Sequence, residues 1–211
     1  MRRSGCPAGK PISQAFDVPA GPDEDPIRLA LSAIDRVHGD GALPPLTVHL
    51  EALAPGQQGY YDPVEVRLAV SPSASRPTLT LIHEIGHVLD HHGLGGAKAL
   101  ASQRHPLLAD WRSVTRQTQK HQILRYITQT SWDAVAIATA THLLLDEELW
   151  ARAYAQYVVV RSKFEALSNQ LDETRRPVAG TVYLPRQWDD GDFAPVADSI
   201  DRLFRRLGWI T

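Results

Sequence analysis

The stretch His83-Glu84-Ile85-Gly86-His87 decides how the rest of this chain is interpreted. Its two histidines are four residues apart, so on an α-helix their side chains lie on one face, one turn from each other. Two imidazole nitrogens placed in this way can bind the same zinc ion, each at about 2.0–2.1 Å. Glu84 projects about 100° around the axis from His83, so it lies beside the ion and not on it. The stretch therefore predicts two zinc ligands, His83 and His87, next to a carboxylate placed for acid–base chemistry.

The sequence around this stretch favours a helix over residues 77–92. Pro77 suits the first turn, where its missing N–H is not needed, and Gly93 can end the helix. Apolar residues occupy the side opposite the histidines, as expected for a helix that covers a core. Gly86 has no side chain, so another backbone could approach the helix closely at that point. We therefore expect a metal-binding helix that packs against a second element.

A catalytic zinc site usually has three protein ligands, so the chain must supply one more. His91 follows His87 by four residues, but three imidazoles in a row along a straight helix cannot converge on one tetrahedral ion. Glu148 begins a second predicted helix, and the small residues Ala151 and Ala155 on its face would let the two helices pack closely. We therefore expect Glu148 to be the third ligand. The full set of candidates is His91, His92, His105, His121, His142, Asp146, Glu147 and Glu148.

Two alternatives to Glu148 stay open at this point. Glu147 is its direct neighbour, and a histidine from the same downstream set could take its place. Acidic residues also favour the first turn of a helix because they offset the helix dipole, so the run 146–148 does not require a metal. Asp90 is a candidate for a carboxylate that orients a ligand histidine without binding the metal itself. A solvated helix surface is the alternative interpretation of Asp90.

The composition is that of an ordinary soluble globular protein. The chain has 211 residues, of which 43% are hydrophobic and 22% charged, so one domain with a core of useful size is expected. The formal net charge of -2 gives no electrostatic case for binding nucleic acid. The single cysteine, Cys6, excludes a disulfide framework and a cysteine-rich zinc site. No signal peptide or membrane span is expected, so the sequence favours a cytoplasmic monomer that does not bind membranes.

Hydrophobic patterns along the chain predict an α+β fold in which a few strands precede many helices. Residues 1–25 contain many prolines and glycines, so a flexible N-terminal arm is expected before a single domain at 26–211. In that domain, a small, mostly antiparallel sheet is expected to pack on the histidine-bearing helix (26–92), and a helical part is expected to follow (93–211). Strands are expected at 46–50, 60–61 and 64–70, and helices at 26–38, 77–92, 97–130 with a break at 105–106, 146–171 and 195–207; residues 132–145 fit either type.

The run His83-Glu84-Ile85-Gly86-His87 resembles the active-site motif of the zincin metallopeptidases, His-Glu-x-x-His. In that family an upstream sheet with an antiparallel edge strand precedes the helix, and substrate lies along that edge; residues 64–70 are the matching strand. Residues 148–154, with the pattern Glu-x-x-Ala-x-Ala-aromatic, resemble the third-ligand helix of the glutamate-ligand zincins (gluzincins), in particular the anthrax toxin lethal factor group. The resemblance covers two short segments. It implies that Glu148 completes the ligand set and that Glu84 is the general base.

The chain departs from two related patterns. Metzincins carry a glycine three residues after the second histidine and a third histidine three residues further on. Asp90 and Gly93 occupy those positions here, so that subclass is disfavoured. The lethal factor group has an oxyanion-stabilising tyrosine shortly before the ligand glutamate, where this chain has Thr141 and His142. Another donor must then stabilise the tetrahedral intermediate, and the candidates are His142, Tyr154, Tyr183 and Arg152.

Together these features predict a zinc-dependent metallopeptidase that hydrolyses a peptide or protein substrate. A water on Zn²⁺ would be activated by Glu84, and His142 or Tyr154 would assist as catalytic residues. The alternative is a catalytically weak or inactive zincin-fold module that serves as a phage-derived or toxin-associated interaction protein, since small domains with this motif also occur beside phage head proteins. A zinc enzyme acting on a non-peptide amide is a third possibility.

Overall fold

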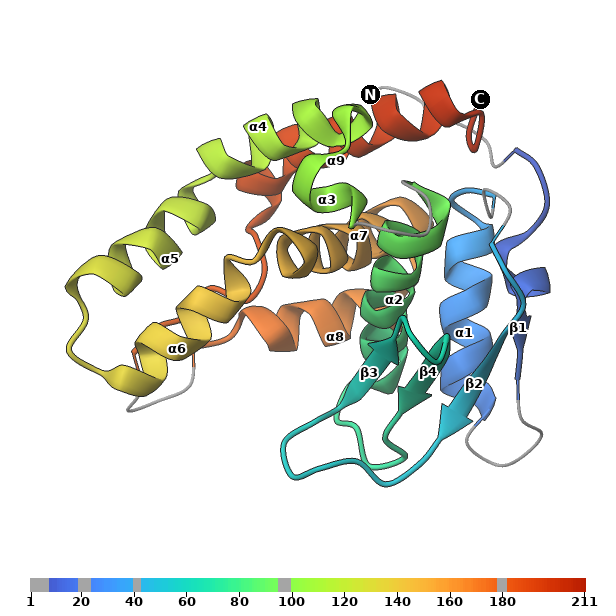
Figure 1. The fold of residues 1–211 in the computed structure, drawn as a ribbon, viewed down its shortest axis with the longest axis horizontal. Coiled ribbons are helices and arrows are strands. Elements are labelled where there is room, and N and C mark those ends of the chain that lie inside the picture. Colours follow the sequence, from blue (N-terminus) through green and yellow to red (C-terminus); the bar gives the residue numbers. More distant parts are fainter. Residues whose placement is uncertain (1–7, 19–23, 40–42, 95–99, 178–181) are drawn as a thin grey trace.

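The computed structural model describes residues 8–18, 24–39, 43–94, 100–177 and 182–211, and it has the expected α+β class. A four-stranded sheet precedes a helical C-terminal part (Figure 1). The strands are β1 (Phe16–Asp17), β2 (Leu46–Leu50), β3 (Gly59–Asp62) and β4 (Arg67–Val70). The α-helices are α1 (Glu24–Asp35), α2 (Pro77–Val88), α3 (Ala101–Arg104), α4 (Ala109–Gln117), α5 (Gln119–Thr130), α6 (Ala134–Leu143), α7 (Asp146–Ser162), α8 (Glu165–Arg175) and α9 (Asp190–Leu207). Within these described ranges, no helix is long and apolar enough to cross a membrane.

The sheet has the strand order β1-β2-β4-β3. Its β1–β2 and β2–β4 pairs are parallel, and only β3 and β4 pair antiparallel, with Tyr60 opposite Ala69. The prediction of a mostly antiparallel sheet is therefore wrong. The reason is connectivity: α1 carries the chain from β1 back to the start of β2, and β3 returns it to the start of β4, so the strands of the β1–β2 and β2–β4 pairs run the same way. The antiparallel edge strand is consequently β3, and the predicted edge strand 64–70 lies inside the sheet as β4.

Two helices cover one face of the sheet. Figure 1 shows α1 and α2 side by side behind the strands, and both contribute buried apolar residues to the main core. In α1, Ile27, Leu31 and Ile34 are buried at helical spacing, which explains why this segment forms a helix against the sheet. The helix α7 packs against α2 and is buried along most of its length, so it joins the sheet part to the helical part.

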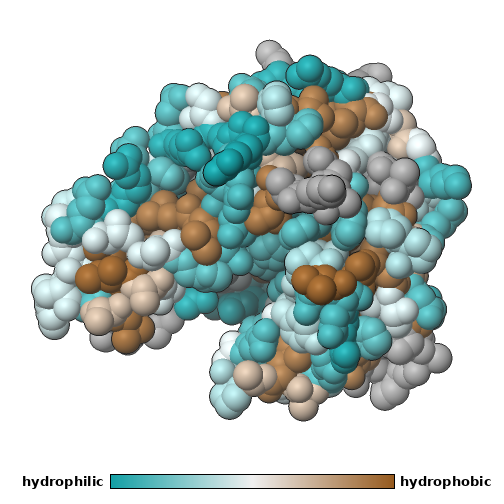
Figure 2. Space-filling view, in the orientation of Figure 1, coloured by the Kyte–Doolittle hydropathy of each residue, from teal (hydrophilic) through white to brown (hydrophobic). Residues whose placement is uncertain are grey.

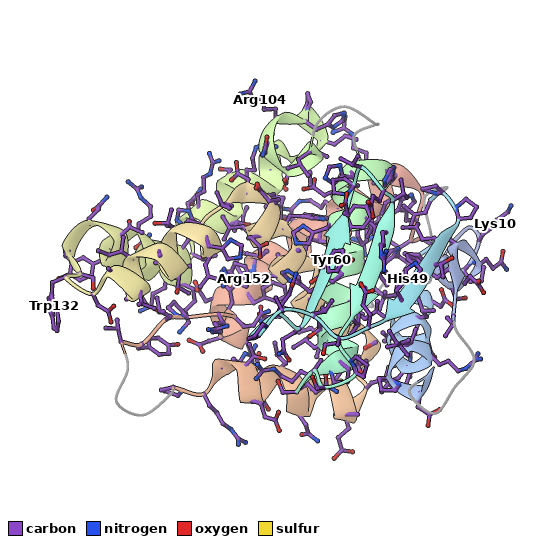
Figure 3. All side chains as sticks on the ribbon, turned by 60° about the horizontal axis from the view of Figure 1, so that its bottom comes forward. Lys10, His49, Tyr60, Arg104, Trp132 and Arg152 are labelled. Carbon is purple, nitrogen blue, oxygen red and sulfur yellow. The ribbon has the colours of Figure 1, made fainter. Side chains whose placement is uncertain are left out.

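The helices α5 and α6 form a hairpin with a small core of its own. Five buried residues make this core: Leu124, Ile127, Ala136, Ala140 and Leu143. The hairpin extends away from the sheet in Figure 1, and Trp132 lies at its tip. The Trp132 side chain projects outward in Figure 3 and is 95% exposed. Residues 132–145, which fitted either type of structure in the sequence, are thus mainly helical.

Two further predictions about local structure are wrong in part. The helix expected over 146–171 is two helices, because Lys163 adopts a left-handed conformation with φ of 60° and ends α7. Residues 11–17, expected in a flexible arm, instead form a short 3₁₀ helix and strand β1, with Ile12 and Phe16 buried in the main core. The rest of that arm at 1–7, which includes Cys6, and at 19–23 lies outside the described residues.

Candidate metal centre

The two helices that carry the predicted ligands are in close contact. A β-carbon added to Gly86 of α2 would lie 2.9 Å from the α-carbon of Ala151 of α7, so only glycine fits there without a shift. One residue earlier on α7, the indole N–H of Trp150 donates a hydrogen bond of 3.0 Å to the carbonyl of Gly86. Gly86 and Ala151, two of the small residues predicted to bring the helices together, therefore lie at their contact. This contact fixes the position along α2 at which Glu148, near the start of α7, lies.

His83, His87 and Glu148 form a group that could hold a metal ion. The Nε2 atoms of the two histidines lie 3.5 and 3.4 Å from the two carboxylate oxygens of Glu148, and one ligand atom from each residue lies within 4.8 Å of the others. Two donors that each lie about 2.0–2.1 Å from a tetrahedral zinc are about 3.3–3.4 Å apart. Each histidine–glutamate separation is close to that value, although the two involve different oxygens of Glu148. The donor set of two imidazoles and one carboxylate is one that zinc accepts.

The charges of this group favour an ion pair when no metal is present. Burial by itself would raise the pKa of Glu148, but its hydrogen bonds with both histidines outweigh burial and hold its pKa well below the usual 4.5. Burial would lower the pKa of His87, yet the hydrogen bond with Glu148 and the charge of Glu84 raise it above the usual 6.5. The group is therefore a compact negative site that attracts positive charge, whether a proton or a cation.

Glu84 lies beside the ligand group and is only 7% exposed. Burial raises the pKa of Glu84, while the nearby His83 and His87 lower it to a smaller extent. The edge strand covers this residue closely, because a β-carbon on Gly59 would lie 3.2 Å from Cγ of Glu84. Glu84 thus lies between the ligand group and the first residue of β3, in the position that the helical spacing predicts.

Two of the four candidate oxyanion donors, His142 and Tyr154, lie in very different places. His142 is near the end of α6, with Nε2 3.6 Å from Glu148 and a side chain that is 60% exposed toward the hollows beside the group. Tyr154 is fully buried, and its hydroxyl forms a 2.8 Å hydrogen bond with Nε2 of His38 in the core. The prediction of a catalytic role for Tyr154 therefore conflicts with its position, since the hydroxyl faces away from the ligand group.

The remaining acidic candidates have other partners. Asp146 accepts two hydrogen bonds from Arg116, and Glu147 accepts one from Gln103. Asp90 is fully buried, with both carboxylate oxygens 2.6 Å from the backbone N–H and hydroxyl of Ser102. No hydrogen bond from Asp90 to a histidine is present among the described residues. Asp90 thus fixes the start of α3, and the predicted orienting contact is not made.

The histidine candidates other than His142 lie outside the group. A π-helical turn, Leu89–Gly93, follows α2 and changes the direction of the two histidines within it. His92 Nε2 pairs with the hydroxyl of Tyr61 at 2.5 Å, and His91 packs against the same tyrosine ring. His105 accepts from the backbone N–H of Leu107, and His121 is buried in α5.

The ligand group lies in a cleft between the sheet part and the helices α6 and α8. Two hollows of about 340 and 460 Å³ meet at the group and share His83, Glu84, His142 and Glu148 in their lining. The larger one reaches Tyr61 and His91, along the edge strand. A further hollow of about 490 Å³ continues the smaller one toward α6 and α8. Figure 2 shows the opening of this cleft between the hairpin α5–α6 and the sheet.

Sequence reasoning missed three residues that shape this cleft. Gly59 allows the edge strand to approach Glu84, and a glycine at a strand start is a known signal for such an approach. Arg76 and Arg186 line the hollow that His83 and Glu148 also border. Arg76 directly precedes a proline-initiated helix and Arg186 lies in a loop, so no local pattern marked either of them.

Comparison with protein-family models, with curated proteins and with solved structures gives no match for this chain.

Proposed function

We propose that this protein is a zinc-dependent metallopeptidase of the glutamate-ligand zincin type. The observation that carries the proposal is the position of Glu84, which is buried beside His83, His87 and Glu148 and borders the same cleft. A structural metal site has no need for an additional carboxylate at this position. A hydrolytic site does need one, because a proton must move from the attacking water to the leaving group.

Zinc suits the donor set better than calcium or magnesium does. Calcium and magnesium favour sites built from oxygen ligands, whereas imidazole nitrogens suit zinc. Two histidines and one glutamate leave one position open for water or substrate, as in catalytic zinc sites. When bound, the ion would polarise the substrate carbonyl and lower the pKa of water at that open position.

Glu84 would move the proton during hydrolysis. Its carboxylate accepts a proton from the water that attacks the carbonyl carbon, and donates it to the nitrogen as the C–N bond breaks. The raised pKa of Glu84, caused mainly by burial, makes its carboxylate a stronger base toward the attacking water. His142 is the candidate donor to the oxyanion, because its imidazole borders the same cleft at 3.6 Å from Glu148.

The edge strand β3 offers a place for an extended peptide. Only one side of β3 pairs with another strand, and Gly59, Tyr60 and Tyr61 line the hollow next to the ligand group. A substrate in extended conformation can add to such an edge through backbone hydrogen bonds. This arrangement would hold the scissile bond in front of Glu84, which lies against Gly59.

Metal analysis combined with a cleavage assay tests the proposal. Protein purified without chelator is expected to contain one zinc per chain, and to cleave a random peptide library by a reaction that chelator stops and zinc restores. Protein that binds no zinc would contradict the proposed site. Protein that binds zinc tightly but cleaves no peptide would favour the alternative function, a non-catalytic interaction module.

A further inference from the structure

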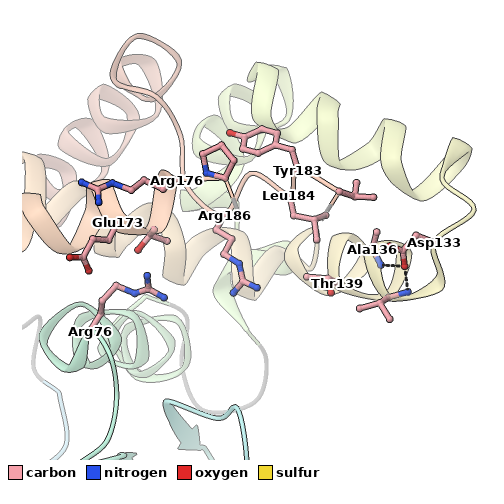
Figure 4. A pocket seen from close by; sticks show the side chains of 13 residues that line it. Arg76, Asp133, Ala136, Thr139, Glu173, Arg176, Tyr183, Leu184 and Arg186 are labelled. Carbon is pink, nitrogen blue, oxygen red and sulfur yellow. Dashed lines mark hydrogen bonds between the residues drawn. The ribbon is translucent and has the colours of Figure 1, made fainter. Parts of the chain in front are cut away.

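The cleft continues from the metal centre to a group of arginine side chains. Arg76 and Arg186 line both the hollow of about 340 Å³ that His83 and Glu148 border and the adjoining hollow of about 490 Å³. Arg176 lines the second hollow only. Figure 4 shows the guanidinium groups of Arg76 and Arg186 pointing into the same space, with Arg176 on the α8 side. A substrate that extends past Glu148 in this direction would therefore meet two guanidinium groups.

These arginines are not neutralised by the protein's own carboxylates. Among the residues that the structure describes, no carboxylate oxygen lies within 4.0 Å of the side-chain nitrogens of Arg76, Arg176 or Arg186. The neighbouring Arg175, by contrast, pairs with Asp172 and Asp190 on the surface. The cleft thus contains guanidinium groups that remain available to a ligand.

Two carboxylates also line the adjoining hollow, and they do not balance its charge. Asp133 accepts hydrogen bonds from the N–H groups of Val135 and Ala136, so it serves as the cap of α6. Asp133 and Glu173 together offset two of the positive charges of the three arginines that line this hollow. The local charge is positive, which favours an anionic group on the substrate.

The structure fixes the two arginines relative to the metal centre. Arg76 directly precedes Pro77 of α2, and a residue before proline has a restricted backbone. The segment that carries Arg186 is tied to α7, because Arg152 donates to the carbonyls of Pro185 and Arg186 at 3.0 and 2.5 Å. Arg152 lies one helical turn after Glu148 on the same helix. Each arginine is therefore attached to an element that carries a predicted ligand.

We propose that Arg76 and Arg186 bind a carboxylate of the substrate, so that the cleft selects peptides with an acidic group a short distance from the scissile bond. This inference rests on the peptidase function proposed above. A guanidinium group matches a carboxylate with two parallel hydrogen bonds, so two such groups form a site for one carboxylate or for two. The carboxylate can belong to an aspartate or glutamate side chain or to the free C-terminus of the peptide.

Binding of matched peptide pools to the Glu84→Gln protein separates these sources. The pools are short random peptides with glutamate or glutamine at one fixed position, each made with a free or an amidated C-terminus. Binding is followed by fluorescence anisotropy, with zinc and with chelator. Pools with the recognised carboxylate are expected to bind roughly 10-fold more tightly or better, as for a hydrogen bond to a charged group. That preference should disappear in Arg76→Ala and Arg186→Ala and persist in Arg206→Ala, which removes an exposed arginine of α9.

Several outcomes would overturn the inference. These are equal binding of all pools, no measurable binding by protein whose circular dichroism shows it to be folded, or a preference that survives when both arginines are replaced. A preference that requires zinc but not the arginines would place the carboxylate on the metal instead. Cleavage of the same pools by the wild type is scored separately. A preference in binding without cleavage supports the carboxylate site and contradicts the peptidase function. Cleavage without any acidic preference supports the peptidase function and contradicts the carboxylate site.

Discussion

Gly86 lies against Ala151 so closely that a β-carbon on Gly86 would be 2.9 Å from the α-carbon of Ala151. This contact joins the helix that carries His83 and His87 to the helix that carries Glu148. Its effect on the candidate metal site is direct, because one turn of α7 separates Ala151 from Glu148. The distance between the two helices therefore sets the distance between the imidazoles and the carboxylate.

Replacing Gly86 by alanine should weaken both the fold and the metal site. The new β-carbon would push α7 away from α2, and overpacking of this kind costs about 1–3 kcal/mol in the free energy of unfolding. Urea unfolding and zinc titration are expected to show lower stability and lower zinc affinity together. The matched control is Gly191→Ala, because a β-carbon there meets no atom within 4 Å. Zinc affinity that is unchanged in Gly86→Ala would show that the helix spacing does not set the site.

The ligand group was predictable because it depends on local spacing. His83 and His87 are one turn apart on one helix, and Glu148 begins another whose facing residues are small. Helix geometry also argues against a catalytic role for Tyr154. Six residues at about 100° each place its side chain about 120° away from that of Glu148 around α7. The sequence therefore contained the reason why the Tyr154 hydroxyl lies in the core with His38.

The sheet order and the helix break could not be predicted in the same way. Parallel or antiparallel pairing depends on which strands meet after the chain has crossed over, so residues 64–70 gave no sign that β4 would lie inside the sheet. The end of α7 depends on Lys163 in a left-handed conformation, which glycine usually adopts at helix ends. Arg76 and Arg186 meet only through tertiary structure, so no sequence pattern could link them.

Glu84→Gln should separate binding from catalysis. Glutamine keeps the size of the side chain but cannot accept and return a proton, so peptide hydrolysis is expected to fall by about 10²–10⁴-fold. Zinc content should stay at the wild-type level, because Glu84 is not one of the three grouped donors. Glu165→Gln, an exposed change in the first turn of α8, is the control for the loss of one negative charge. Wild-type cleavage by Glu84→Gln would remove Glu84 as the general base.

Arg152 is expected to act as a structural residue and not as the oxyanion donor. It is buried, which lowers its pKa to about 10, and its guanidinium donates to the carbonyls of Leu143, Pro185 and Arg186. Arg152→Met would leave these carbonyls without a partner, so we expect a loss of about 3 kcal/mol or more in the free energy of unfolding.

Arg202→Met is the matched control for Arg152→Met in urea unfolding. It breaks an ion pair with Asp110 in which both side chains are more than half exposed, and exposed pairs contribute about 1 kcal/mol or less. Similar losses in the two variants would show that Arg152 does not hold the segment that carries Arg186.

The stability of the metal-free protein should depend on pH through Glu148 and His87. The pKa of Glu148 is lower in the folded chain than its usual 4.5, so its contribution to stability is complete above that value and is lost as the pH falls through the folded pKa. The pKa of His87 is raised above its usual 6.5, so its contribution is complete below that value and is lost as the pH rises through the folded pKa. The contact between the two residues should therefore stabilise the metal-free fold most between these values.

A double-mutant cycle with His87→Asn and Glu148→Gln measures this contact. In the presence of chelator, the coupling free energy from urea unfolding is expected to be about 1 kcal/mol or more near pH 5.5 and smaller near pH 8.5. With saturating zinc, the coupling free energy should instead be larger near pH 8.5 than near pH 5.5. The histidines must lose their protons to bind the ion, so stability should then rise with pH. If the coupling free energy measured with chelator does not change with pH, the two side chains do not form an ion pair. Reversal by zinc would show that the same two side chains, now as ligands, hold the helices α2 and α7 together.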